Sequence, residues 1–258
     1  IVVKLTGIGF KLTPQQLFWL NSMPGLAAGT LRIVHTFLIP VLGTRKTIAA
    51  STLLLAIPAV GWGFAVTNPN TSFTTFLILA FLAGLGGGNF SSFMPSTSLF
   101  FPKKLQGTAL GIQAGIGNFG VSVVQFVTPA ILGIALVGLP QTFVKDGKES
   151  SIFLQNASWI WVPFVVIGAV VAWFGLRSVP VQASFKEQLD IFKDKHTWLM
   201  TSLYIMTFGS FSGLAATFPL LIKQLFGGFE NAPDPLAFAF LGPLVGAGIR
   251  VVAGPIAD

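Results

Sequence analysis

Long apolar runs recur along the whole chain, and short polar segments separate them. A helix needs about 20 mainly apolar residues to cross a hydrocarbon core of roughly 30 Å. Lipid cannot satisfy exposed backbone polar groups, so each run is expected to be helical. Hydropathy predicts spans at Gln16–Leu42, Thr47–Val66, Ser72–Ser98, Thr108–Val137, Trp159–Arg177, Thr197–Phe226 and Leu236–Ala257. The pattern predicts an all-α polytopic membrane protein.

Two polar segments add detail to this plan. Thr13-Pro14-Gln15-Gln16 has the hydroxyl-to-Gln spacing of a capping box with Pro at the first helical position, although a plain loop ending in Pro would read the same way. FKEQLDIFKDK (185–195) interleaves opposite charges at helical spacings, which predicts a surface helix between two membrane bundles. The predicted domains are an N-terminal bundle at 1–177, a cytoplasmic linker at 178–196 and the start of a C-terminal bundle at 197–258.

Composition agrees with a membrane protein, because 53% of the residues are hydrophobic, 9% are charged and the mean hydropathy is +0.79. The net charge of +7 follows from topology, since positive residues in short loops mark the cytoplasmic side. These residues form no aromatic-interleaved patch, so no nucleic-acid partner is expected. The absence of cysteine excludes disulfides and thiolate metal sites. The loops predicted inside carry Arg45, Lys46, Lys103, Lys104, Arg177, Lys186, Lys193 and Lys195, and those predicted outside are NPNTS (68–72), VKDGKES (144–150) and GGFENAPDP (227–235).

Two arginines lie inside predicted spans. Arg32 is about eleven residues, or roughly 16 Å, from the cytoplasmic end of its span, which is farther than its side chain can comfortably snorkel. Gly25, Ala28, Gly29 and Thr36 lie within about 60° of Arg32 on a helical wheel, so this face is predicted to pack inward. Arg250 has Gly246 and Gly254 one turn away on either side. Each arginine lies four residues before the first position of a G-x-x-x-D-like pattern. Gly254 and Asp258 match this pattern after Arg250, whereas Thr36 and Pro40 after Arg32 match it only in spacing, so the sequence indicates a weak internal repeat.

No Asp or Glu lies in the interior of any predicted span, so the spans supply no carboxylate for these arginines. A buried guanidinium costs several kcal/mol unless it is paired. We expect the partner to be an anion from outside the protein, and the planar fork of Arg suits an oxyanion such as nitrate, carboxylate or phosphate. The alternative is a carboxylate in a part of the protein that this chain does not include.

The stretch AGIGNFGVSVVQFVTP (114–129) contains glycines and amides within an apolar run. Small residues four apart allow two helices to approach closely, whereas the amides indicate a bundle interior that also binds something polar. A stripe of small and polar residues covers roughly 80° of this helix, namely Gly111, Gly115, Asn118, Ser122, Gln125 and Pro129. The preceding span has a similar series, Gly84, Gly88, Ser92 and Ser96, with Asn89 and Phe90 beside it.

The segment GGGNFSSFMPSTSLFFPKKLQGTALGIQAGIGNFGVSVVQFVTP (86–129) resembles the nitrate/nitrite porters of the major facilitator superfamily. Gly115-x-Gly117-Asn118-x-Gly120 is similar to their nitrate signature. Further similar stretches run through the chain in order: LTPQQLFWLNSMPGLAAGTLR, TNPNTSF, FFPKKLQG, ASWIWVP, SLYIMTFGSFSG and LAFAFLGPLVGAGIR. Two positions depart from the family pattern: Gln113-Ala114 replaces a frequent Asn-Gly, and Pro40 replaces an acid.

The resemblance implies a twelve-helix major facilitator fold of two six-helix halves, of which this chain would be a fragment covering helices 2 to 8. The chain begins without Met and stops at GPIAD, as expected for a fragment. The resemblance also implies that Arg32 and Arg250 hold nitrate or nitrite, that Asn118 and Tyr204 hydrogen-bond near it, and that Phe90 confines it. It places the protein as a monomer in the cytoplasmic (inner) membrane of a bacterium or archaeon.

The predicted mechanism is nitrate/nitrite antiport by alternating access, with no cofactor. Proton-coupled nitrate symport is the alternative, because His35 lies near Arg32 and can titrate near neutrality, although it could instead be a neutral hydrogen-bonding residue. An anion channel, or a carrier of another small oxyanion in the same superfamily, would also use buried arginines. The sequence contains no catalytic constellation, so an enzyme is not expected.

Overall fold

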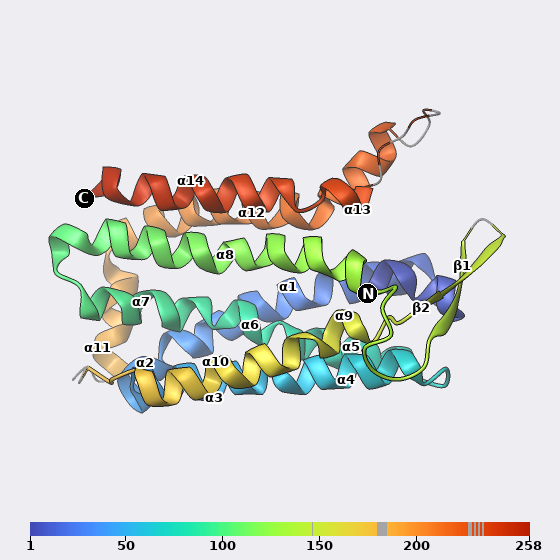
Figure 1. Cartoon of the computed structure of the whole chain (residues 1–258). Coiled ribbons are helices and arrows are strands. Elements are labelled where there is room, and N and C mark those ends of the chain that lie inside the picture. The colour runs from blue at the N-terminus through green and yellow to red at the C-terminus, as the bar shows by residue number, and fades with distance from the viewer. Residues whose placement is uncertain (146, 180–184, 227–228, 230, 232, 234) are drawn as a thin grey trace. The chain divides into compact units, whose positions relative to one another are not determined.

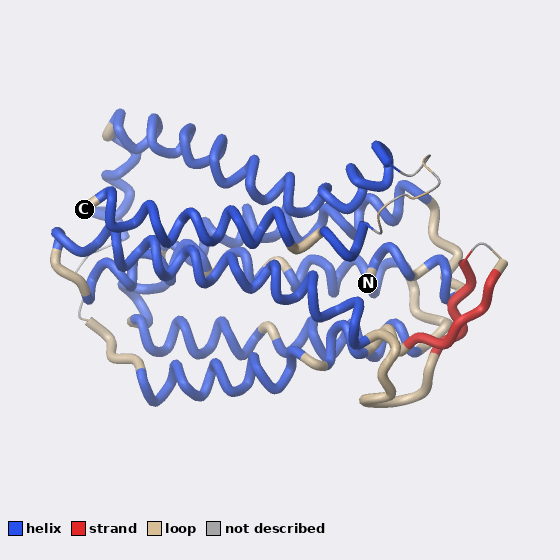
Figure 2. The backbone as a smooth tube through the Cα atoms, turned by 45° about the horizontal axis from the view of Figure 1, so that its top comes forward, coloured by secondary structure: helices blue, strands red, loops and turns tan. Residues whose placement is uncertain are grey.

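The structure is a computed structural model that describes residues 1–258 except 146, 180–184, 227–228, 230, 232 and 234. Helices make up most of the described chain (Figure 1), and a short hairpin is the sheet found within it (Figure 2). In chain order the elements are η1 (Val2–Lys4), η2 (Thr6–Ile8), α1 (Pro14–Thr36), α2 (Leu38–Leu42), α3 (Thr44–Leu54), α4 (Ala56–Thr67), α5 (Phe73–Ala83), α6 (Leu85–Gly88), α7 (Phe90–Phe100), η3 (Lys103–Leu105), α8 (Gln106–Ile131), β1 (Gln141–Lys145), β2 (Lys148–Ile152), α9 (Asn156–Trp159), α10 (Trp161–Gly175), α11 (Phe185–Leu189), η4 (Asp190–Lys193), α12 (Lys195–Phe226), α13 (Pro235–Phe238) and α14 (Leu241–Ala257).

Within the described residues, five helical stretches are long and apolar enough to cross a membrane. Each overlaps one of the predicted spans. The other two predicted spans overlap α1 with 23 residues and α12 with 32, both of which are long enough to cross a membrane. The five are Thr44–Thr67, Phe73–Phe100, Lys103–Ile131, Asn156–Gly175 and Leu236–Ala257.

The predicted capping box at the start of α1 is confirmed. Thr13 Oγ1 accepts a hydrogen bond from Gln16 N at 3.2 Å, and Gln16 Oε1 accepts one from Thr13 N at 2.9 Å. Pro14 is the first helical residue, where its missing N–H leaves no hydrogen bond unmade. These bonds fix the residue at which the helix begins.

Several predicted spans are divided into shorter helices, and two of the differences from the predicted limits have a clear local cause. The predicted span Gln16–Leu42 is divided at Phe37, three residues before Pro40, which has no N–H for the helical ladder. The span predicted to reach Val137 ends at Ile131. The buried Asn156 side chain donates to the carbonyls of Ile131 at 3.1 Å and Ile134 at 2.7 Å, so it satisfies backbone groups where the helix stops.

The segment predicted as an outer loop forms an antiparallel hairpin. Strand β1 pairs with β2, with Gln141 opposite Ile152 and Lys145 opposite Lys148. Gly147 has φ of 73°, a left-handed conformation that glycine adopts without a Cβ penalty. In the sequence, the Asp-Gly dipeptide at 146–147 is the feature that indicates a hairpin turn. The predicted surface helix, in contrast, is present as α11 and η4.

The described chain forms two compact units. Unit 1 comprises Ile1–Ser96 and Ala130–Val181, and unit 2 comprises Thr97–Pro129 and Gln182–Asp258. Most of α8 thus groups with the C-terminal helices. The bundle limits proposed from sequence, 1–177 and 197–258, remain a prediction, and each unit is described by itself below.

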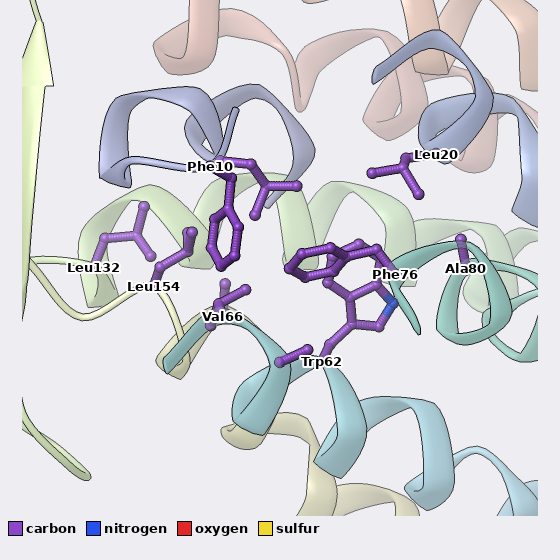
Figure 3. Packing of buried hydrophobic residues seen from close by; sticks show 11 residues of the cluster. Phe10, Leu20, Trp62, Val66, Phe76, Ala80, Leu132 and Leu154 are labelled. Carbon is purple, nitrogen blue, oxygen red and sulfur yellow. The ribbon is translucent and has the colours of Figure 1, made fainter. Parts of the chain in front are cut away.

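A cluster of buried apolar residues packs the N-terminal segment of unit 1 against α1, α4 and α5 (Figure 3). Phe76 of α5 is fully buried, and its ring lies 5.0 Å from that of Phe10 in an edge-on arrangement and 5.2 Å from that of Trp62. Leu132 and Leu154, which flank the hairpin in sequence, join the same cluster. The N-terminal segment and the hairpin connection are therefore packed onto the helix ends.

The basic loops of unit 1 gather at its other end. The backbone N–H of Arg45 donates to Ser178 Oγ at 3.2 Å, which brings the start of α3 next to the segment that carries Arg177. The polar connection 68–72 follows α4 at the end occupied by the cluster around Phe76 and Trp62. The loop predicted outside and the segments around Arg45 and Arg177 predicted inside thus lie at opposite ends of the helices of unit 1, and the membrane orientation stays a prediction.

Candidate anion-binding site

Arg32 of α1 is half-buried against the junction of α6 and α7. Its Nε donates to the carbonyl oxygen of Gly87 at 3.2 Å. Its Cζ lies 5.4 Å from the centre of the Phe90 ring, within the range of a cation–π contact. The carbonyl and the ring together fix the plane of the guanidinium. The structure thus brings together two residues of the predicted site, Arg32 and Phe90.

Glycines allow α6 to approach α1 this closely. A Cβ on Gly87 would collide with the Cβ of Ala28, and one on Gly84 would lie 2.7 Å from the carbonyl oxygen of Pro24. Gly88 is buried against Leu31 and His35. The close approach places the Gly87 carbonyl within reach of Arg32. The glycines that sequence singled out as packing residues in this region, Gly84 and Gly88, do make such contacts.

The face of α1 that packs in unit 1 is only partly the predicted one. Ala28 lies against Gly87, but Gly25 and Gly29 are exposed within the unit and a Cβ at either position would meet no atom within 4 Å. Thr36 is exposed as well, and its hydroxyl donates to the carbonyl of Arg32 at 2.8 Å. The contacting face is rotated toward Ala27, which is fully buried.

Serines of α7 complete the surroundings of Arg32. Ser91 Oγ lies 2.9 Å from the Arg32 carbonyl and 3.0 Å from that of Gly88, so its hydroxyl can donate to either one. His35, 5% exposed, has Nδ1 at 3.4 Å from Ser92 Oγ, and Ser92 Oγ lies 3.0 Å from the Asn89 carbonyl. If the serine hydroxyl donates to that carbonyl, Nδ1 of His35 is the donor to Ser92. His35 therefore has a hydrogen-bonding environment in unit 1.

Unit 2 holds the remaining predicted site residues. Tyr204 and Phe208 of α12 stack with ring centres 5.3 Å apart at an angle of 4°, and Phe211 follows with its ring 6.2 Å from Phe208. A Cβ on Gly246 would lie 3.0 Å from the Phe211 ring, so this aromatic row reaches α14 one turn before Arg250. Arg250 is half-buried, and it forms no ion pair within the described part of the chain.

The amide-bearing stripe of α8 is buried in unit 2. Asn118 is 9% exposed and Ser122 is 3% exposed. Gln125 Nε2 donates to the carbonyl of Ala215 in α12 at 3.2 Å. Among the described residues, Ser122 Oγ and Gln125 Oε1 are buried without a hydrogen-bond partner. The stripe thus contains unsatisfied polar atoms, as expected for a helix face that meets a polar ligand or water.

The glycines of α8 divide into two groups. Gly111 and Gly115 lie against α14, where a Cβ on Gly111 would be 2.7 Å from Gly254 Cα and 3.0 Å from the Arg250 carbonyl. Gly117 and Gly120 belong to the nitrate-signature stretch, and a Cβ added at either one would meet no atom within 4 Å. Close packing against α14 therefore explains Gly111 and Gly115. Gly117 and Gly120 have no such packing role in unit 2.

Unit 2 also contains a carboxylate contact that no pattern in the sequence had indicated. Asp258 accepts hydrogen bonds from the backbone N–H of Gly107 at 2.6 Å and of Thr108 at 2.7 Å, and also from the Thr108 hydroxyl. These groups lie at the N-terminal end of α8, where an anion is stabilised by free N–H groups. The hydrogen bond from the Thr108 side chain is the main reason that the pKa of Asp258 lies below its ordinary value.

Comparison with known proteins agrees with the resemblance seen in the sequence. The sequence model of the Major Facilitator Superfamily matches residues 3–258. The chain is 66% identical over 263 residues to the probable nitrate/nitrite antiporter NarK2 of Thermus thermophilus, covering 100% of this chain and 59% of that protein. It is 42% identical over 264 residues to the nitrate/nitrite transporter NarU of Escherichia coli (strain K12), covering 100% and 55%.

A more distant relative is the nitrite extrusion protein of Bacillus subtilis (strain 168), 25% identical over 85% of this chain and 51% of that protein. The chain therefore spans between about half and three fifths of the length of these relatives. The fold class and the resemblance stated from sequence are confirmed at the level of the family. The chain belongs to the Major Facilitator Superfamily and is similar to its nitrate/nitrite transporters.

Proposed function

We propose that the full-length protein exchanges nitrate for nitrite across the membrane, with Arg32 as a principal anion ligand. The observation that carries the proposal is the fixed guanidinium of Arg32, held by the Gly87 carbonyl and the Phe90 ring inside a span without Asp or Glu. The names of the relatives supply the substrate class. Transport, and not catalysis, is the activity that these relatives suggest.

The chemistry of the arginine matches a planar oxyanion. A guanidinium offers N–H donors in a rigid fork that can bind two oxygens of one anion, whereas an ammonium acts as a point charge. Nitrate and nitrite are both planar and carry their charge on oxygen. A guanidinium with a fixed plane selects the orientation of such an anion, and the Phe90 ring covers one face of the guanidinium.

We further propose that Arg250, Asn118 and Tyr204 of unit 2 bind the same anion in the full-length protein. Arg250 is half-buried and forms no ion pair within the described residues, and Asn118 is buried on the amide stripe of α8. A site that combined two fixed positive charges would be strained by their repulsion when empty, and one bound anion would relieve that repulsion. A carrier of this kind returns more readily when loaded, which favours exchange over net movement.

Proton-coupled symport is the second candidate, with His35 as the titrating group. His35 lies on α1 close to Arg32 and has Ser92 as a hydrogen-bond partner, so protonation would alter a contact next to the proposed anion ligand. The same contact also suits a histidine that stays neutral and only orients α7. A His35→Gln variant retains hydrogen bonding without titration and separates the two roles.

The proposed location is the cytoplasmic membrane of a bacterium, since the named relatives are bacterial and the helices suit a bilayer. We propose a monomer, because each half of a major facilitator protein would supply one arginine to a single site. The basic loops around Arg45 and Arg177 would face the cytoplasm, as the positive-inside rule requires.

The test is nitrate uptake into proteoliposomes that contain the purified full-length protein. Nitrite inside the vesicles should accelerate uptake strongly, Arg32→Lys should abolish it, and the exposed hairpin variant Lys148→Gln should behave as wild type. Uptake that requires an inward proton gradient and is lost in His35→Gln would replace exchange with symport. Flux far above carrier turnover, without acceleration by internal nitrite, would indicate an anion channel.

A further inference from the structure

A groove on unit 1 has no part in the anion site. Helices α3 and α10 pack side by side (Figure 1), and an apolar groove with a volume of about 340 Å³ runs between them. Its floor is made of small residues, among them Ala49 and Ala169, which are buried. Its sides include Leu53, Val170 and Trp173, which are 50%, 49% and 43% exposed.

One end of the groove is basic. The guanidinium of Arg45 lies over the ring of Trp173, 5.2 Å from its centre, so the charge sits directly at the mouth of the groove. Lys46 and Arg177 are exposed on the same two chain segments, and the bond from Arg45 N to Ser178 Oγ holds these segments together. Segments 38–56 and 161–179 contain no Asp or Glu. Within the described residues Arg45 forms no ion pair.

We propose that this groove binds an anionic phospholipid, with one acyl chain between α3 and α10 and the phosphate on Arg45. The dimensions agree with this occupant. Ala49 and Leu53 lie four and eight residues after Arg45, which is about 6 Å and 12 Å along the helix. The groove therefore covers the acyl region of one leaflet, whose hydrocarbon depth is about 15 Å.

The charge pattern selects this lipid over other occupants. A neutral lipid would fill the apolar groove but would gain nothing from Arg45, Lys46 and Arg177. A second copy of the chain bound symmetrically through this groove would bring the same three cations against their own copies, which is unfavourable. Basic residues at the cytoplasmic edge of a helix pair attract anionic headgroups, and a tryptophan at that level is typical of the interface.

Trp173 provides a direct probe of occupancy. The full-length protein is reconstituted in phosphatidylcholine vesicles doped with brominated phosphatidylglycerol or brominated phosphatidylcholine, and the Trp173 signal is the difference between wild type and Trp173→Phe. Brominated phosphatidylglycerol should quench this signal at a mole fraction about fivefold lower than the neutral lipid, the preference expected for one arginine at a membrane surface. High salt should not change the binding of acyl chains in the groove, but it should reduce the preference for phosphatidylglycerol over phosphatidylcholine.

Variants distinguish recognition of the headgroup by Arg45 from binding of the acyl chain in the groove. Arg45→Gln should remove the preference for phosphatidylglycerol, Arg45→Lys should keep most of it, and Lys148→Gln at the hairpin should not change it. Ala50→Phe should fill the groove and weaken quenching by both lipids. Nitrate exchange by the Arg45 and Ala50 variants reports that they are folded, because neither residue belongs to the proposed anion site.

Two results would overturn the proposal. Equal quenching by the two brominated lipids, or a preference that survives Arg45→Gln, would show that no anionic headgroup is bound there. Cross-linking between two copies through Ala50→Cys, with Trp173 protected from both lipids, would show that a second copy covers the groove. The proposal depends on the membrane-spanning fold and is independent of the nitrate site, so failure of one does not affect the other.

Discussion

The contact between Gly87 and Ala28 makes the position of Arg32 sensitive to a single methyl group. In Gly87→Ala the added Cβ would collide with the Ala28 Cβ, so α6 has to move away from α1. Overpacking of this kind costs about 1–3 kcal/mol, against which the better helix propensity of alanine offsets about 1 kcal/mol. The same movement lengthens the hydrogen bond from Arg32 Nε to the Gly87 carbonyl, now 3.2 Å.

The neighbouring glycine supplies a matched control. A Cβ on Gly86 would lie 3.5 Å from a methyl carbon of Leu55, an ordinary van der Waals distance, so Gly86→Ala should be neutral or slightly stabilising. The two variants have the same composition and lie in the same short helix. The expected difference in unfolding free energy between them is about 1–3 kcal/mol, all of it due to the contact with Ala28.

The assay combines stability with function. Thermal unfolding of the purified full-length protein should rank Gly86→Ala above Gly87→Ala, and nitrate affinity in Gly87→Ala should fall about tenfold, the loss expected when a hydrogen bond to a charged group is weakened. Ala28→Gly removes the colliding atom, so the double variant Gly87→Ala/Ala28→Gly should recover nitrate affinity. Equal behaviour of the Gly86 and Gly87 variants, or no recovery in the double variant, would refute the reasoning.

Other predictions concern single contacts. Replacing Asp258 by Asn should lower the free energy of unfolding near neutral pH. Because the folded-state pKa of Asp258 is lowered, its stabilising contribution is present above the ordinary value of 3.8 and is lost as the pH falls through the folded-state pKa. Unfolding measured across acidic pH should therefore depend less on pH in the variant than in the wild type. Thr13→Ala should cost about 0.5–2 kcal/mol in denaturant unfolding by removing the α1 cap, while Thr13→Ser should cost little. Phe76→Ala should cost about 3–5 kcal/mol, whereas truncation of Phe18, which is 66% exposed, should cost far less.

The helices were predictable because lipid imposes one solution on every long apolar run. The capping box of Thr13 and Gln16 was predictable because it depends on residues three apart. The hairpin was missed because its strands are short, mostly exposed and mostly polar, so they show little of the apolar alternation that identifies a half-buried strand.

The orientation of α1 was only partly predictable. In a membrane helix both the lipid-facing and the protein-facing sides are apolar, so hydrophobic periodicity does not identify the buried face. Small residues narrow the choice, yet Gly25 and Gly29 resemble Ala27 and Ala28 in size while only the alanines contact α5 and α6 in unit 1. Which carbonyl receives the Arg32 hydrogen bond depends on that rotation, and so it required the structure.

The weak repeat stays a prediction, because Thr36 is exposed whereas the corresponding Gly254 packs against Gly107 and Gly111. The two arginine-bearing helices nevertheless share one local feature, a glycine-rich neighbour. In unit 1, α6 approaches the helix that carries Arg32 through Gly87, and the glycine carbonyl binds the arginine side chain. In unit 2, α8 approaches the helix that carries Arg250 through Gly111, whose missing side chain leaves room for the Arg250 backbone carbonyl. Each arginine thus lies on a helix packed against a glycine-rich neighbour, and larger residues at these glycines would displace the arginine-bearing helix. The glycines therefore constrain the placement of charge as well as the packing of helices, which explains why an apolar span retains residues that weaken it as a helix.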